Sequence, residues 1–449
     1  MVMRPRVLLI NPWIYDFAAF DLWAKPLGLL YLGAFLQKSG YDVRLVDCMD
    51  RLHPDASGHG ARAGRIRGTG HWRREVMPTP EVLKSTPRRF ARYGLSEEAF
   101  LKPLAIELKP DLVLVTSVMT YWYPGVHRVI ELIREVWPGM KIILGGNYAT
   151  LCRDHARRYS GADIVISGPV ESSFFELENA LLEDHGNYDS SKKLSWSEVW
   201  PALDLYPDLD FAPLLTSRGC PGDCPYCASN LLFPFFEQRP VEDILAEIED
   251  RHRTFGISDF TFFDDALLIK AETHLMPILE GVLGRGLNLN FHAPNGLHVA
   301  SINLDLARLM FKAGFKTLRL GLETLDWEQQ AEWGGKVRTG QFEQAINSLV
   351  EAGFSSQQIG VYLLYGLPEQ SFDEVLETAL TVKAQGARPC LSEFSPIPGT
   401  ILWHEVKKHS EFDLEAEPLY HNNSFFPFRG PGFSWEKVQE VKRRILSRD

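Results

Sequence analysis

Residues 212–227 read Ala-Pro-Leu-Leu-Thr-Ser-Arg-Gly-Cys-Pro-Gly-Asp-Cys-Pro-Tyr-Cys, an apolar run followed by three closely spaced cysteines. The run at 212–217 is typical of a buried strand. Cys220, Cys224 and Cys227 follow it with the spacing C-x3-C-x2-C. The glycines and prolines between them permit the tight turns of a loop that wraps a metal centre. The segment therefore predicts a strand that leads into a metal-binding loop.

The number of cysteines narrows the choice of metal. A structural zinc site normally takes four protein ligands, and no Cys/His pair follows at finger-like spacing. Three thiolates suit a [4Fe–4S] cluster with one iron left open for a substrate or cofactor. Structural zinc and unrelated thiols are the alternatives. We expect the remaining cysteines, Cys48, Cys152 and Cys390, to be ordinary packing residues.

Strands and helices alternate beyond residue 212. Apolar runs predict six strands, at 212–217, 257–263, 287–292, 316–321, 358–364 and 388–394. Helical patterns follow the first five, at 240–254, 272–284, 303–313, 339–352 and 372–385. Six such units match a partial (β/α)6 barrel of the TIM type, whose reactive groups belong at the C-terminal strand ends. Polar residues gather at those ends: Asp264, Asp265, His292, Asn295, Arg319, Glu323, Tyr365, Gly366, Ser392 and Glu393.

The first half of the chain predicts a second α/β domain. Strands are expected at 7–11, 42–47, 111–117, 141–146 and 163–168, and helices at 27–36 and about 126–136. This order indicates a Rossmann-like, doubly wound parallel sheet with ligands at the C-terminal strand ends. We expect a domain at 1–185, a polar, proline-containing linker at 186–211, the barrel at 212–400, and a helical cap at 401–449.

An insertion at 51–95 interrupts the first domain. Residues 51–93 hold ten Lys/Arg against three Asp/Glu. This composition predicts a solvated, partly disordered loop, and a lid or a contact to an anionic ligand is the alternative.

Composition excludes several classes of protein. The chain has 449 residues, of which 45% are hydrophobic and 23% charged, which excludes a disordered or disulfide-stapled protein. The net charge of −11 gives no reason to expect nucleic-acid binding. No apolar stretch approaches the roughly 20 residues of a membrane span, and the first apolar run is too short for a signal peptide. We therefore expect a cytoplasmic protein.

The cysteine loop resembles that of the radical S-adenosylmethionine (SAM) enzymes. The resemblance rests on the cysteine spacing, on Tyr226 before the third cysteine, and on the partial barrel. It implies that the open iron chelates the amino and carboxylate groups of SAM. One electron from the cluster would then cleave the sulfonium and release a 5′-deoxyadenosyl radical, which abstracts a substrate hydrogen. A reductant such as flavodoxin or ferredoxin is implied as a partner.

The same resemblance implies which residues contact SAM. Asp264 and Asp265 end the second strand, where the family binds the methionine amine. Asn295 follows the third strand, near the ribose. Arg319 and Glu323 lie on the fourth-strand segment, where they would contact SAM or pair with each other. A Tyr-Gly-Leu-Pro segment resembles the part that packs the adenine. The implied SAM contacts are Tyr226, Asp264, Asp265, Asn295, Arg319, Glu323, Gly366 and Pro368.

The first domain resembles the cobalamin-binding domain of one radical SAM subclass. In such domains a D-x-H-x-x-G motif supplies a histidine to cobalt, but alignment on Gly28 places Trp23 and Lys25 at the aspartate and histidine positions. The resemblance then implies no histidine ligand from this loop, which favours methyl transfer; loss of the cofactor is the alternative. Tyr121, Trp122 and Tyr123 would wall the upper face or pack in the core. The implied cobalamin contacts are Asn11, Lys25, Gly28, Ser117, Gly145, Gly146, Gly168 and Glu171.

These resemblances imply a cobalamin-dependent radical SAM C-methyltransferase that acts on a small metabolite. One SAM would supply a methyl group to cobalt and a second the radical. A non-methylating radical SAM rearrangement or cyclisation enzyme is the alternative within enzymes. From another class, a non-catalytic iron–sulfur or corrinoid module that relays electrons or methyl groups stays open. A methylthiotransferase is disfavoured, because residues 1–200 hold only Cys48 and Cys152.

Overall fold

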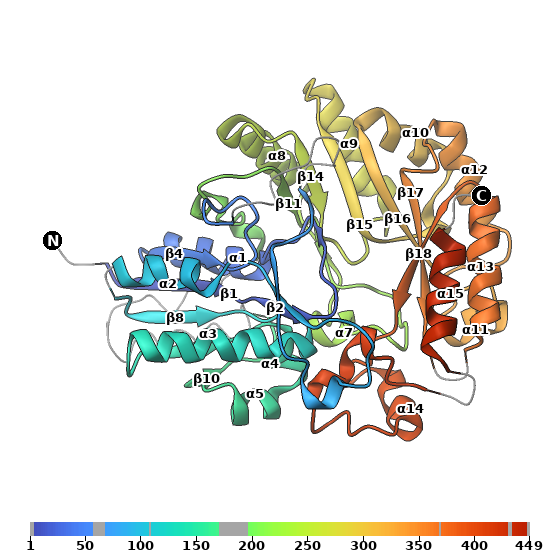
Figure 1. Ribbon diagram of the computed structural model, residues 1–449. Helices are drawn as coiled ribbons and strands as arrows, with labels where there is room; N and C mark the ends of the chain where they lie inside the picture. Colours follow the sequence, from blue (N-terminus) through green and yellow to red (C-terminus); the bar gives the residue numbers. More distant parts are fainter. Residues whose placement is uncertain are drawn as a thin grey trace. The chain divides into compact units, whose positions relative to one another are not determined.

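The computed structural model describes residues 4–56, 68–106, 109–169, 196–367, 370–429 and 433–446. The chain forms two compact units (Figure 1). Unit 1 comprises Met1–Leu209 and Leu414–His421, and unit 2 comprises Asp210–Asp413 and Asn422–Asp449. Two of the predicted ligand contacts, Glu171 and Pro368, lie outside the described residues. Among the helices of the described residues, none combines the length and apolar character that a membrane crossing requires.

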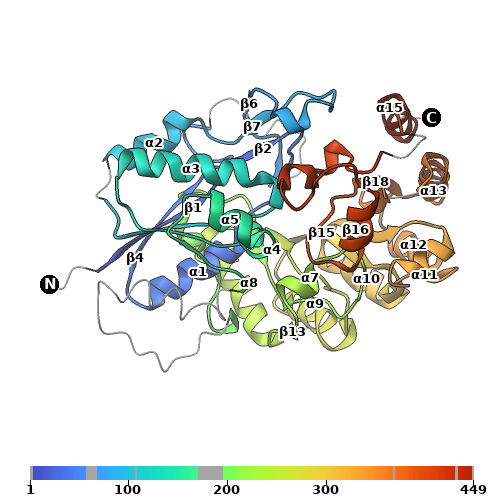
Figure 2. The ribbon, with the colours of Figure 1, turned by 90° about the horizontal axis from the view of Figure 1, so that it is seen from below.

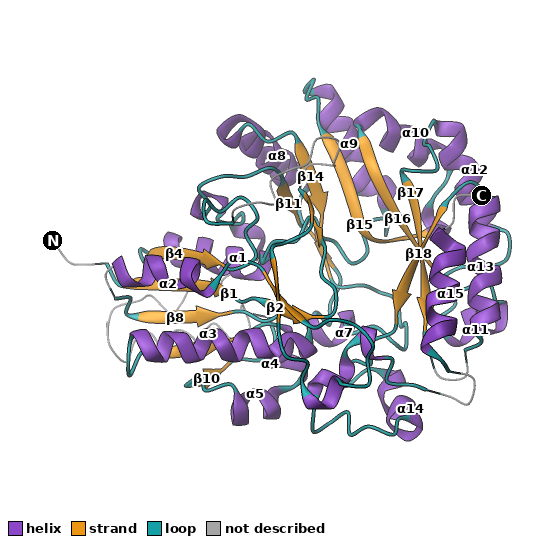
Figure 3. Cartoon of the chain, in the orientation of Figure 1, coloured by secondary structure: helices purple, strands orange, loops and turns teal. Residues whose placement is uncertain are grey.

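Unit 1 is built on a five-stranded parallel sheet in the order β10-β9-β8-β1-β4 (Figure 3). Its strands are β1 (Arg6–Asn11), β4 (Asp42–Asp47), β8 (Leu112–Val115), β9 (Ile142–Leu144) and β10 (Ile164–Val165). The predicted five strands and their parallel arrangement are confirmed. The chain runs from β1 to β4 on one side and to β8 on the other, so a topological switch point lies between β1 and β8, where ligands of open α/β sheets bind.

Helices of unit 1 follow the strands as the sequence predicts, with one longer and two short additions among the described residues. The predicted helices at 27–36 and about 126–136 are confirmed as α1 (Leu27–Lys38) and α3 (Tyr123–Val136). The additional helix is α2 (Glu97–Ile106), and two short helices, α4 (Asn147–Leu151) and α5 (Arg153–Tyr159), follow β9. The apolar residues of α1 pack on the sheet in one core with those of β1 and β8.

The predicted solvated loop at 51–95 is wrong for residues 68–95, the longer of its two described parts. Short antiparallel strands form there: β5 (Thr69–Gly70) pairs with β3 (Asp21–Leu22), and β7 (Ala91–Tyr93) pairs with β2 (Ile14–Asp16) and β6 (Arg74–Val76). Trp72 and Tyr93 are buried in a small core of their own. The basic composition concealed this packing, because Arg92 is itself buried in ion pairs with Glu75 and Glu97.

The expected linker at 186–211 is packed onto unit 1 over residues 196–209. Trp196, Leu203 and Tyr206 are buried there. The Tyr206 hydroxyl donates to the Oδ2 atom of Asp47 at 2.6 Å. The prolines and polar residues of this stretch are typical of a linker. Its few aromatic and aliphatic side chains nevertheless hold it against unit 1, because they are buried there.

Unit 2 contains the predicted partial barrel. Its six parallel strands pair in chain order: β11 (Ala212–Leu214), β14 (Asp259–Phe262), β15 (Asn290–His298), β16 (Phe315–Glu323), β17 (Ile359–Tyr365) and β18 (Arg388–Glu393). The predicted helices are present as α8 (Val241–Phe255), α9 (Leu275–Gly284), α10 (Leu304–Ala313), α12 (Gln341–Ala352) and α13 (Phe372–Ala384). Because all six strands are parallel, their C-terminal ends meet at one edge of the sheet.

The predicted cap at 401–449 is divided between the two units. Helix α14 (Ile401–His409) and helix α15 (Trp435–Leu446) belong to unit 2, and α15 packs along α13 (Figures 1 and 2). Lys442 of α15 forms an ion pair with Glu393 at the end of β18. The segment Leu414–His421, in contrast, belongs to unit 1.

The segment Leu414–His421 is held in unit 1 by buried polar contacts. His421 is 1% exposed; its Nε2 donates to the Leu414 carbonyl at 2.7 Å, so its Nδ1, 2.9 Å from Thr120 Oγ1, accepts a hydrogen bond. The Tyr123 hydroxyl donates to Glu417 at 3.0 Å. Burial lowers the pKa of His421 to about 4, which keeps the imidazole neutral at pH 7.

Unit 1 should therefore lose stability in mild acid. An unfolded histidine has a pKa of about 6.5, so between that pH and about pH 4 the unfolded chain binds more protons than the folded chain at His421. The free energy of unfolding falls as the pH drops through this window. We expect the melting temperature of an H421N variant to depend less on pH between 7 and 4.5 than that of the unchanged protein. An H404N variant, changed at an exposed histidine of α14, is the control; equal pH dependence in all three proteins would contradict the prediction.

Two adjacent glycines after β9 should differ in their tolerance of a side chain. Gly146 has φ +91°, and a Cβ atom there would lie 2.2 Å from the Ser117 carbonyl oxygen, whereas a Cβ atom on Gly145 meets open space. A G146A variant should lose at least about 1–3 kcal/mol of unfolding free energy through backbone strain alone. The matched G145A variant should change it by no more than about 0.5 kcal/mol. Urea unfolding of the two variants measures the difference, and equal losses would show that the strand end accommodates the clash.

Candidate functional site

The three cysteines lie on one loop at the C-terminal side of the first barrel strand. The loop begins after β12 (Ser217–Arg218), which pairs with β13 (Glu237–Gln238), and ends at the short helix α7 (Ser229–Leu232). Cys220, Cys224 and Cys227 are free thiols. At the start of the loop Gly219 has φ +74°, and a Cβ atom there would lie 2.5 Å from the Phe235 carbonyl oxygen. Only glycine fits this turn, so the loop conformation is fixed by the sequence.

Hydrogen-bond donors approach the cysteine sulfurs. The backbone amide of Gly222 donates to Cys220 Sγ at 3.4 Å, and that of Ser229 donates to Cys227 Sγ at 3.5 Å. His298, at the end of β15, places its Nε2 4.0 Å from Cys220 Sγ. Its Nδ1 is buried and has no hydrogen-bond partner among the described residues. Hydrogen bonds to the sulfurs are one of the means by which proteins tune iron–sulfur clusters.

This donor set fits an iron–sulfur cluster better than a single ion. Nowhere in the described part of the chain do three His, Cys, Asp or Glu side chains converge on a position for one metal ion. Each thiolate of a cluster binds a different iron, so the three thiols of the loop need not meet at one point. Three loop thiols with amide donors at two of their sulfurs therefore suit a [4Fe–4S] cluster.

An ion pair that the sequence did not indicate lies beside the cysteine loop. Lys336 donates to Glu323 Oε1 at 2.6 Å, and its Nζ lies 5.5 Å from the ring centroid of Tyr226. Glu323 ends β16 with φ +71°. Burial lowers the pKa of Lys336, but the negative charges of Glu323 and Cys224 outweigh burial and raise it, so the side chain stays cationic.

The expected pairing of Arg319 with Glu323 is wrong. The Arg319 guanidinium donates to the Leu318 carbonyl at 2.9 Å and lies against Gly360, where a Cβ atom would approach it to 2.8 Å. Glu323 is paired with Lys336 instead. The two side chains of β16 lie four residues apart along an extended strand, and each finds a nearer partner. Their contacts to SAM stay predictions.

Asp264 has a structural role, and its predicted contact to SAM stays a prediction. Its carboxylate is buried and accepts hydrogen bonds from the backbone amides and hydroxyls of Thr216 and Ser217, at 2.5–3.2 Å. The side-chain amide of Asn295 donates to the carbonyls of Phe263 and Asp264, at 3.0 and 3.2 Å. These bonds connect the ends of β11, β14 and β15. Contacts of Asp265 and Asn295 to SAM stay predictions.

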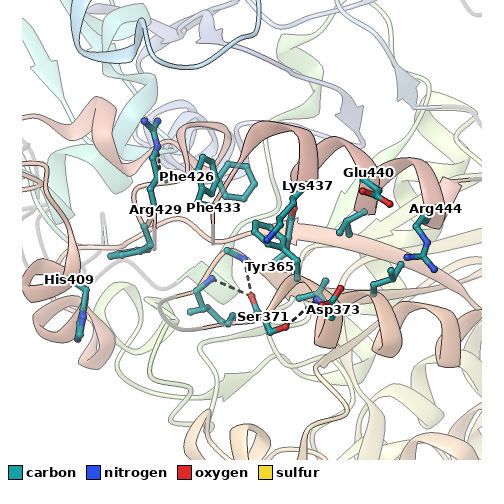
Figure 4. A pocket seen from close by; sticks show the side chains of 18 residues that line it. Tyr365, Ser371, Asp373, His409, Phe426, Arg429, Phe433, Lys437, Glu440 and Arg444 are labelled. Atoms are coloured by element: carbon teal, nitrogen blue, oxygen red, sulfur yellow. Dashed lines mark hydrogen bonds between the residues drawn. The ribbon is translucent and has the colours of Figure 1, made fainter. Parts of the chain in front are cut away.

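Gly366 is one of the residues that line a cavity of about 700 Å³ in unit 2, shown in Figure 4. Tyr365 at the end of β17, Ser371 and Asp373 at the start of α13, and Lys437 of α15 line it. The amide of Gly366 donates to Gln370 Oε1 at 2.9 Å. The predicted backbone contact of Gly366 with adenine is thus in competition with a glutamine of the same turn, and it stays a prediction.

The predicted cobalamin contacts of unit 1 gather at one edge of its sheet. Asn11, Ser117, Gly145, Gly146 and Gly168 follow β1, β8, β9 and β10 or end them. They form hydrogen bonds within unit 1: Asn11 donates to Asp47 Oδ1 at 2.6 Å, and the Ser117 hydroxyl donates to the Gly145 carbonyl at 2.7 Å. The amide of Gly168 donates to a threonine hydroxyl at 3.0 Å. These bonds shape the edge, and the cobalamin contacts stay predictions.

Lys25, at the position of the missing cobalt-ligating histidine, is buried in unit 1. Its Nζ lies 4.0 Å from Asp50 Oδ1 and 3.8 Å from the ring centroid of Tyr206. Gly28 is exposed, and open space surrounds it. The contacts of the aromatic residues after β8 favour the alternative that they pack within the protein. Trp122 donates from its indole nitrogen to Asp16 at 2.8 Å, and Tyr121 is buried.

Comparisons with known proteins agree with both units. Residues 214–382 match the radical SAM superfamily, and residues 93–178 match the B12 binding domain. An uncharacterized methyltransferase of Pyrococcus horikoshii is 25% identical over 344 residues, which cover 69% of this chain and 73% of that protein. The bacteriochlorophyllide d C-12(1)-methyltransferase of Chlorobaculum tepidum is 24% identical over 337 residues, covering 69% of each chain.

A solved structure shares the architecture of the whole chain. It is the radical SAM methyltransferase TsrM of Kitasatospora setae, with cobalamin and a [4Fe–4S] cluster bound. The match has a TM-score of 0.68 at 17% identity and covers 98% of this chain and 91% of that one. The radical SAM match includes the three cysteines and strands β14 to β17, and the B12-binding match includes β8, β9 and β10. The chain therefore combines a radical SAM domain, matched over residues 214–382, with a B12-binding domain, matched over residues 93–178.

Proposed function

We propose that the protein is a cobalamin-dependent radical SAM methyltransferase that transfers a methyl group to a carbon atom of a small molecule. One observation carries the proposal: a three-cysteine loop ends the first barrel strand of a chain whose first unit matches a B12-binding domain. Both relatives described above are named methyltransferases, which favours methyl transfer over rearrangement.

Residues of the cysteine loop would hold the cluster and donate hydrogen bonds to it. Cys220, Cys224 and Cys227 would bind three irons, and the amides of Gly222 and Ser229 would donate to two of the sulfurs. When bound, the cluster and SAM supply a carbon-centred radical, and cobalamin carries the methyl group. Cys227 is exposed, so a reducing compartment such as the cytoplasm would keep it from forming a disulfide and available to bind iron.

Lys25 favours methyl transfer because it cannot act as a ligand to cobalt. Its ammonium group is buried near Asp50 and the ring of Tyr206. A protonated lysine has no lone pair and cannot ligate a metal. Cobalamin bound to unit 1 would then have no protein ligand from this loop. An electron donor of the flavodoxin or ferredoxin type would complete the system.

Substitution of the loop cysteines should abolish cluster binding. After anaerobic reconstitution with iron and sulfide, the unchanged protein should show the broad visible absorbance of a [4Fe–4S] cluster and form 5′-deoxyadenosine from SAM under reduction. C220A, C224A and C227A should each lose most of the iron and all detectable 5′-deoxyadenosine, because each removes one of three ligands.

The matched control is C390A, which removes a free thiol of β18 outside the loop and should leave iron content and 5′-deoxyadenosine unchanged. Zinc in place of iron in the anaerobically purified protein would refute the cluster. Full 5′-deoxyadenosine formation without a methylated product would instead favour the rearrangement or cyclisation alternative.

Bound cobalamin should lack a histidine ligand. We expect the reconstituted protein to retain hydroxocobalamin through gel filtration. The EPR spectrum of its cobalt(II) form should show no nitrogen hyperfine splitting, because Lys25 replaces the ligating histidine and is buried near Asp50. Nitrogen splitting in that spectrum would show that a ligand from another part of the chain, or the vitamin's own base, binds the cobalt. A protein that retains no cobalamin would support loss of the cofactor.

A further inference from the structure

Lys336 supplies the one partly buried ammonium group that the described residues place against the cysteine loop. It follows helix α11 (Trp327–Glu332) through two glycines, Gly334 and Gly335, which have φ +104° and +59°. A Cβ atom on Gly334 would lie 3.2 Å from Cys224 Cα and 3.5 Å from its Sγ. The chain therefore passes directly over Cys224 before the lysine side chain turns inward.

The contacts of Lys336 fix its charge near the thiols. Its side chain is 20% exposed and is held by Glu323, whose side chain is 10% exposed, at 2.6 Å. The ring of Tyr226, between Cys224 and Cys227 in the loop, lies under the ammonium group at 5.5 Å. Two opposite charges thus stand together at the edge of a site that would hold a cluster with three thiolates.

Charge near a cluster changes how readily it accepts an electron. A cluster with three thiolate ligands becomes more negative by one charge on reduction. A nearby cation stabilises the reduced form, and a nearby anion destabilises it, and both effects are strong where burial limits solvent screening. Lys336 and Glu323 therefore act on the cluster with opposite signs.

We propose that the charge of Lys336 raises the reduction potential of the cluster. Glu323 is the positioning residue, because it holds the ammonium group over the loop, and it partly offsets that charge. This inference rests on the proposed function only in requiring that the cluster be bound. It assigns a role in electron entry rather than in methyl transfer. No substrate is needed to test it.

The test is a redox titration of the reconstituted cluster, followed by EPR in the absence of SAM. The K336Q variant should shift the midpoint potential to a lower value than that of the unchanged protein. The E323Q variant should shift it to a higher value. The K336R variant keeps the cation and should stay close to the unchanged protein, and the K336Q/E323Q double variant should lie between the two single variants.

A matched control is K408Q, which removes an exposed lysine of α14 that pairs with Glu405 in the same way. It should leave the potential unchanged. Iron content is measured for every variant. A K336Q protein that loses its iron would overturn the proposal in favour of a role in holding the loop.

The sign reversal separates this proposal from a structural one. A purely structural ion pair predicts shifts of the same sign, or no shift, for K336Q and E323Q, and either outcome overturns the proposal. If the unchanged protein holds no cluster, the proposed function fails. If it holds a cluster whose midpoint potential is the same in K336Q, only this inference fails.

Discussion

The carboxylate of Asp264 connects the barrel sheet to the loop that carries its chemistry. It accepts hydrogen bonds from both the amides and the hydroxyls of Thr216 and Ser217, where the chain leaves β11 for the cysteines. A buried carboxylate with so many donors is satisfied without a cation, and its neighbours cannot move without leaving it unpaired. The position of the cysteine loop at the C-terminal edge depends on this bond set, together with the turn that only Gly219 permits.

The architecture could be predicted because it depends on repeated apolar patterns. The barrel strands span three to nine residues, rich in apolar side chains and bounded by polar turns, and β4 of unit 1 begins and ends at the predicted residues 42 and 47. The cysteine spacing identified the loop without any knowledge of its contacts. Strand β15 shows the limit of this approach: it continues through Pro294 and Gly296 after a register shift, so its end at His298 lies beyond the predicted 287–292.

The side-chain partners could not be predicted, because they depend on pairs far apart in the chain. Glu323 and Lys336 are separated by a helix and two glycines, and no periodicity relates them. The basic insertion misled for a related reason: charge counts do not show that Arg92 would be buried with two carboxylates, or that Trp72 would need a core. Composition gives the residues of a segment, whereas their burial depends on the partners that other parts of the fold place against them.

The return of residues 414–421 to unit 1 has a practical meaning for work with fragments. Because these eight residues are encoded after the barrel, a truncated protein that stops at residue 209 would lack the groups that cover Thr120 and Tyr123. The hydroxyl of Thr120, which binds His421, and the phenol of Tyr123 would then be exposed to water. Cutting the gene at the apparent domain border therefore removes part of the first domain, and a separable corrinoid module has to be built by joining the short C-terminal piece back through a new connection.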